Sequence, residues 1–228
     1  MDMERKMLSE ASAQHNKRWS RRNLLRTGAV VGAAATAIGI PAMVKQVDAA
    51  PGKNAKNANN INDAKVLNGA LFYEHQAIWA YSFAATKLTS TDVGKAVLAV
   101  ALANQADHKK HRDTLATVIK QLGGTPVAAQ TQYDLSSYLK AGEGALDSDV
   151  NIAKLALALE TDAAIAYGQE AAKLKTPALI TAGASIGATE ASHATLIRAA
   201  FKSLGVNLAV IPASFVSADT RSAWVLKV

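Results

Sequence analysis

The chain of 228 residues contains no cysteine, and aromatic residues make up only 5% of it. The lack of cysteine excludes a disulfide scaffold, a thiolate zinc site, an iron–sulfur cluster and a cysteine nucleophile. The 14 glycines and 5 prolines gather between long runs that contain few of either, and half of all residues are apolar. This composition favours helix and suffices for one domain with a buried core.

The first 49 residues have the character of an export signal. Residues 20–26 read SRRNLLR and precede an apolar stretch rich in alanine and glycine at 27–40. This segment resembles a twin-arginine (Tat) signal peptide, and the small residues of VDAA at 47–50 suit a signal peptidase. The 14-residue apolar stretch is shorter than the roughly 20 residues that span a bilayer. An uncleaved membrane anchor is the alternative.

The Tat resemblance implies a protein that is periplasmic or otherwise exported, with the Tat translocase as a partner. Residues 51–60, PGKNAKNANN, follow the signal, and we expect a flexible linker over 50–61. The signal contains eight of the 25 basic and four of the 18 acidic residues, which leaves 17 and 14, or a net charge of +3. No basic face is evident, so we expect no nucleic acid partner.

Four long segments carry the apolar spacing that is typical of amphipathic helices. They cover about 62–88, 91–122, 149–174 and 176–204. About 25 residues, with one short helix expected at 134–139, separate the second segment from the third. A connection of this length can cross a whole bundle, so these two helices can run parallel. The sequence therefore predicts an all-α fold, a four-helix bundle over 62–204 with a long crossover between helices 2 and 3.

The C-terminal tail, residues 205–228, lies outside the four periodic segments. It contains Trp224 and alternating apolar residues. These features suit either a segment that covers the bundle or one that meets a partner, and the sequence leaves both open.

Each of the four apolar stripes is interrupted at mid-helix by ionisable residues. Burying an uncompensated carboxylate costs several kcal/mol, roughly, so such residues converge in a core only if protons or cations neutralise them. Three carboxylates with three imidazoles have the composition of a site for divalent metal. We therefore predict as metal ligands Glu74, His108, His111, Glu160, Glu190 and His193.

The chain also repeats itself. The pattern A-L-x-x-E-x-x-A-x-x-A-Y-x-x-x-A begins at Ala70 and again at Ala156. When His111 is aligned with His193, the Leu-Gly pairs that close both segments also coincide. Two helical hairpins related by a pseudo-two-fold axis follow, with the polar site on that axis. We expect the tyrosine of each repeat to hydrogen bond near the site.

Four helices, one long middle connection and this order of ligands resemble the ferritin-like superfamily, and among its members the secreted bacterial proteins with Tat signals. The resemblance covers about residues 62–204. It implies that Glu74 and Glu160 are terminal ligands, that Glu190 bridges two metals, and that His111 and His193 are terminal imidazoles. The second helix departs from the pattern, because His108 stands where the family has a glutamate. Neighbouring Asp107 is turned by about 100° and is not expected to substitute for it.

The resemblance implies an exported metal-binding protein, with iron the first choice and zinc, manganese or copper as alternatives, and with redox chemistry on iron, oxygen or peroxide. Whether it is an enzyme stays open, since the missing glutamate removes one bridge and one negative charge. The competing interpretation is a non-catalytic envelope protein whose polar core is a degenerate metal site. The sequence is compatible with a homo-oligomer but identifies no interface.

Overall fold

The computed structural model describes residues 53–228. The signal predicted over residues 1–49 lies outside this range. Within it, none of the helices combines the length and the apolar character that a membrane crossing requires. The helices in chain order are α4 Lys53–Ala85, α5 Asp92–Gln121, α6 Ser136–Lys140, α7 Asp149–Ala171, α8 Pro177–Ser203, η2 Ala218–Thr220 and α9 Arg221–Trp224.

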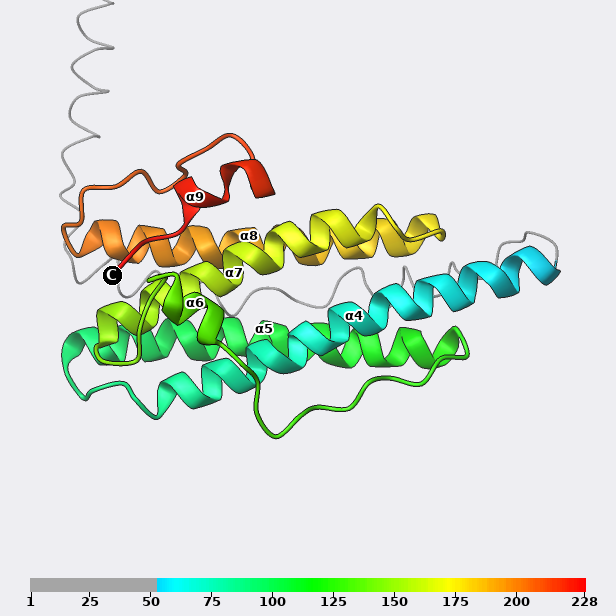
Figure 1. Ribbon diagram of the computed structural model, residues 1–228, viewed down its shortest axis with the longest axis horizontal. Coiled ribbons are helices and arrows are strands. Elements are labelled where there is room, and N and C mark those ends of the chain that lie inside the picture. Colours follow the sequence, from blue (N-terminus) through cyan, green and yellow to red (C-terminus); the bar gives the residue numbers. More distant parts are fainter. Residues whose placement is uncertain (1–52) are drawn as a thin grey trace, which may run out of the picture. The chain divides into compact units, whose positions relative to one another are not determined.

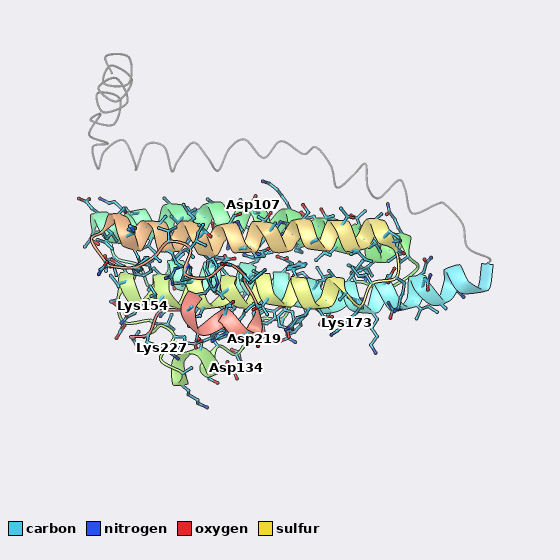
Figure 2. The ribbon with its side chains drawn as sticks, turned by 90° about the horizontal axis from the view of Figure 1, so that it is seen from above. Asp107, Asp134, Lys154, Lys173, Asp219 and Lys227 are labelled. Carbon is cyan, nitrogen blue, oxygen red and sulfur yellow. The ribbon has the colours of Figure 1, made fainter. Side chains whose placement is uncertain are left out.

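The four long helices form the predicted bundle. Figure 1 shows α4 and α5 as one antiparallel pair and α7 and α8 as the other. In Figure 2 the same bundle, seen from above, has α5 and α8 along one side and α4 and α7 along the other. The part of the chain that is described contains no strand. The all-α prediction is confirmed.

Local signals set most helix boundaries. The Thr91 side chain accepts a hydrogen bond from the Gly94 amide at the start of α5, and Ser148 does the same for Asn151 at the start of α7. Gly205 follows the end of α8 with φ +93°, a left-handed conformation that favours glycine. The two N-caps explain why α5 and α7 begin within a residue of their predicted starts, and α8 begins at Pro177, a residue that is favoured in the first turn of a helix.

The first helix begins at Lys53, nine residues before its predicted start, and so includes residues 53–61 of the expected linker. Asp63 is fully buried, and its carboxylate accepts hydrogen bonds from the amides of Lys175 and Thr176 at the turn between α7 and α8. A helix fixed at this point extends at little cost into a segment that contains lysine and alanine, since only nucleation is expensive.

The connection from α5 to α7 crosses the bundle lengthwise, as predicted, so α5 and α7 run in the same direction (Figure 1). Asn68 of α4 fixes its beginning by donating to the Thr125 carbonyl and accepting from the Val127 amide. Buried Tyr133 then packs on Phe72 and Trp79 of α4, with ring centroids 5.4 and 5.7 Å apart. The expected short helix appears as α6.

The tail covers α7 and α8, which is one of the two possibilities that the sequence left open. Trp224 is 3% exposed and packs on Leu157, Ile197 and Phe201. Buried Arg198 donates to the carbonyls of Ala209 and Trp224. Asp219 and Lys227 mark the course of the tail in Figure 2.

Arg221 of the tail also ties two parts of the bundle together. Its guanidinium donates two hydrogen bonds to Glu143 at the end of the crossover, at 2.8 and 2.6 Å, and contacts Asp162 of α7. These bonds, with one from Lys227, lower the pKa of Glu143 to about 2. The crossover is therefore held on α7 by bidentate ion pairs, the geometry in which arginine binds carboxylates best.

Candidate metal centre

The structure brings all six predicted residues together in one cluster at mid-bundle. Each of the six is at least 93% buried. They form two overlapping groups, in each of which the candidate ligand atoms lie within 4.8 Å of one another. Each group contains two glutamates and two histidines, and both contain His108 and Glu190.

The first group is centred on His111. Its Nδ1 lies 3.0 Å from Glu190 Oε1 and 3.5 Å from Glu74 Oε1. Although they are buried and close, His111 Nδ1 and Glu190 Oε1 have no hydrogen-bond partner. Buried polar atoms without a partner cost about 1–3 kcal/mol each. A cation between these two atoms would satisfy both.

The second group is centred on His193. Its Nδ1 lies 3.1 Å from Glu190 Oε2 and 3.2 Å from Glu160 Oε2. On the other side of the ring, Nε2 lies 3.4 Å from Asp107 Oδ2. Asp107 is on the side of the bundle formed by α5 and α8 (Figure 2). A carboxylate behind a histidine fixes its tautomer and leaves the opposite nitrogen free for metal.

His108 lies between the two groups. Its Nδ1 is 2.8 Å from Glu74 Oε2, and its Nε2 is 3.2 Å from Glu160 Oε1 and 3.7 Å from Glu190 Oε2. The imidazole thus contacts all three glutamates of the cluster, using both of its nitrogens. By the internal alignment it occupies the position related to Glu190 by the pseudo-two-fold axis.

The two tyrosines of the repeat form hydrogen bonds between the two helical hairpins. Tyr81 of α4 donates to Glu160 of α7, and Tyr167 of α7 donates to Glu74 of α4. The expectation that they hydrogen bond near the site is therefore confirmed. Burial, together with the facing carboxylates, raises the pKa of both hydroxyls, so the tyrosines act as donors.

Opposite charges within the cluster shift the pKa values of its members more than burial does. Burial alone would raise the pKa of Glu74, but the facing imidazoles of His108 and His111 lower it to about 2. Burial would lower the pKa values of the imidazoles, yet the facing carboxylates raise that of His111 to about 9, that of His193 to about 10, and that of His108 well above its usual value. In the metal-free state the imidazoles are therefore protonated, and metal must displace these protons.

The residues present fit a divalent metal ion. Ligands at about 2.0–2.2 Å from a metal lie roughly 3.0–3.5 Å from each other, and the contacts of His111 and His193 with the glutamates fall in this range. Two imidazoles with carboxylates form a donor set that suits iron, and that also suits zinc or copper. The unpartnered atoms of His111 and Glu190 support the same conclusion.

Two residues of the site were missed by the sequence analysis. Asn104 is 1% exposed and donates to the Tyr81 hydroxyl and to Glu160 Oε1, at 3.1 and 3.3 Å. It was visible only as a polar residue on an apolar stripe. Asp107 was set aside as a ligand because of its angle on the helix; the structure keeps it out of both groups but places it behind His193.

Comparison with known families finds a match that contains the candidate site. A sequence model described as a ferritin-like domain matches residues 62–203, which is more than half of the chain. The matched residues begin within α4 and end with α8, so they contain the whole candidate metal centre. No match to a curated protein is found.

Proposed function

Because this chain belongs to the ferritin-like domain family, we propose that it binds one or two divalent metal ions, iron first, at the six-residue cluster. The observation that carries the proposal is the pair of overlapping groups that share His108 and Glu190. Glu74 and His111 would hold one ion, Glu160 and His193 the other, and Glu190 would lie between them. When bound, iron supplies a redox couple for oxygen or peroxide chemistry.

The protein's own residues orient the ligands at this site and keep water away from them. Tyr81 and Tyr167 orient the terminal glutamates by hydrogen bonds, and Asp107 orients His193. The surrounding bundle keeps bulk water away from the ligands, since none of the six is more than 7% exposed. The arrangement is therefore pre-organised, which lowers the cost of binding an ion.

We also propose that the protein is exported. The support is the segment SRRNLLR with its following apolar stretch, which resembles a Tat signal. Tat substrates cross the membrane folded, so a centre loaded before export would travel with the protein.

A second function is favoured by the position of His108. Its contacts with Glu74 and Glu160 pair opposite charges without any metal. A cluster neutralised in this way can serve as the polar core of a non-catalytic envelope protein. The two functions differ in whether the folded protein depends on metal.

Metal content separates the two functions. We expect the wild-type protein, exported through its own Tat system, to contain one or two metal ions per chain, and the Glu190→Ala, His193→Ala double variant to contain almost none. The matched control is Glu170→Ala, His75→Ala, which changes the same residue types outside the cluster and should keep the metal. Elemental analysis of the purified proteins gives the result. Equal metal content in the wild type and the double variant would refute the metal-binding proposal.

Chelation provides an independent check on the same proteins. A site that binds metal only when folded stabilises the protein by about 2.7 kcal/mol when free metal is at 100 times Kd. Removing metal should therefore lower the thermal midpoint of the wild type and the control, and leave that of the double variant unchanged. A wild type that is indifferent to chelation supports the non-catalytic structural function.

The contact of Asp107 with His193 predicts that loss of Asp107 weakens metal binding without abolishing it. Asp107→Ala should weaken metal binding about 10–100-fold, the usual effect of removing a carboxylate behind a histidine ligand. Competition with a chelating dye measures the affinity. Asp113→Ala is the control, because Asp113 lies on the same helix with a side chain that is 69% exposed and pairs with Arg112. An unchanged affinity in Asp107→Ala would show that the contact does not orient the ring.

A further inference from the structure

A cavity of about 220 Å³ lies between α4 and α7, directly beside the cluster. Its inner end is formed by Tyr81, His108 and Glu160. Leu135 and Tyr138 of the crossover and apolar residues of α7 also line it. The exposed ring of Tyr73 is also part of its lining, so the cavity reaches the surface on that side.

The internal repeat explains why there is space at this place. Ala77 and Ala80 of α4 line the cavity, and so do Ala163 and Ala166, which are their equivalents on α7. The same motif that positions Glu74 and Glu160 thus also places small side chains three and six residues after each glutamate. With a methyl group at each of these positions, the two helices leave a volume unfilled next to the polar centre.

The size and chemistry of the cavity restrict what it can hold. An apolar cavity of about 150 Å³ accepts benzene, so about 220 Å³ admits a six-membered ring with a short substituent. Most of the lining is aliphatic or aromatic, while the carboxylates of Glu160 and Asp162 are part of it. Both carboxylates are already paired with positive groups, Glu160 with His108 and Asp162 with Arg221, so the lining leaves no unbalanced positive charge for an anion. An anion would lose its hydration in a mostly apolar cavity, whereas an uncharged hydroxyl loses less and can donate to a carboxylate oxygen.

We propose that this cavity is the binding site for a small, uncharged, mainly apolar alcohol whose hydroxyl faces Glu160 and the candidate metal centre. That the alcohol is a substrate of the centre rests on the proposed metal function. Binding itself does not, because the alanines, the leucines and Tyr81 line the cavity without a metal ion.

The proposal is tested by calorimetric titration of two probes that share a ring but differ in charge, cyclohexylmethanol and cyclohexanecarboxylate. We expect the alcohol to bind the full-length protein at least 10-fold more tightly than the carboxylate, both with metal and after chelation. Comparable binding of the two probes, or no binding of the alcohol, would overturn it.

Variants that fill the cavity locate the binding site. Ala163→Leu should weaken binding of the alcohol at least 10-fold, and Ala77→Leu on the opposite wall should do the same, so that the result does not depend on the folding of one variant. Ala184→Leu, on an exposed position of α8 outside the cavity, is the matched control and should bind like the wild type. Unchanged binding in both folded cavity variants would overturn the proposal.

The metal-content measurement on the same samples keeps the two proposals apart. Protein that contains metal and does not bind the alcohol refutes the cavity proposal alone. Protein that binds the alcohol and contains no metal keeps the binding site and refutes the metal function.

Discussion

Replacing His108 with glutamate is expected to make the fold dependent on metal. In the metal-free wild type, the imidazole contacts Glu74 and Glu160 at 2.8 and 3.2 Å and compensates their charge. His108→Glu removes this partner and adds a fourth carboxylate to a buried cluster. Breaking a buried ion pair from one side costs about 3–5 kcal/mol, and we expect the metal-free variant to lose stability by this amount. Urea unfolding after chelation measures the loss.

With metal present, we expect the additional carboxylate of His108→Glu to be favourable. Four carboxylates carry the charge that neutralises two divalent ions, and the variant regains the bridging glutamate that the ferritin-like pattern places there. We therefore expect His108→Glu to bind two ions per chain, and to gain more stability from saturating metal than the wild type does. Titration with ferrous iron under anaerobic conditions gives the stoichiometry.

His108→Gln is the control for this experiment, because it removes the imidazole without adding a charge. It should lose stability in the metal-free state but gain no additional metal. If His108→Glu without metal proves as stable as the wild type, then His108 does not compensate the glutamates. If it binds no more metal than His108→Gln, then position 108 does not act as a bridge.

The sequence was sufficient to predict the bundle and the cluster because both depend on helical periodicity. Glu74, Glu160 and Glu190 interrupt apolar stripes, and residues on one stripe face the same core, so four such helices must bring them together. The repeat also relates Tyr81 to Tyr167. The structure adds that each tyrosine donates to the glutamate of the opposite hairpin, which depends on how the hairpins pack.

Other features depend on contacts between segments that are distant in the chain and carry no periodic signal. Asp107 lies off the apolar stripe, and its role follows from the position of His193 on α8. The early start of α4 depends on Asp63, whose partners are 112 and 113 residues away. The docking of the tail depends on Arg198, a residue type that is usually exposed and is buried here against backbone carbonyls.

Replacing Trp224 with alanine is expected to cause a large loss of stability outside the metal centre. Its side chain packs on Leu157, Ile197 and Phe201, and its indole donates to the Phe215 carbonyl at 3.0 Å. Removing a buried tryptophan side chain costs about 3–5 kcal/mol when the structure around it does not collapse. The bonds of Arg198 to the tail backbone keep the segment in place, so we expect the full cost in urea unfolding.

Trp224→Phe largely separates packing from the hydrogen bond, because it keeps an aromatic ring and removes the indole donor. It should cost about 1–2 kcal/mol, the contribution of one buried bond and some lost contact area. Metal content should be unchanged in both variants, since Trp224 belongs to neither ligand group. A loss below about 1 kcal/mol in Trp224→Ala, with faster proteolysis of residues 205–228, would mean that the tail undocks separately and that the bundle is stable without it.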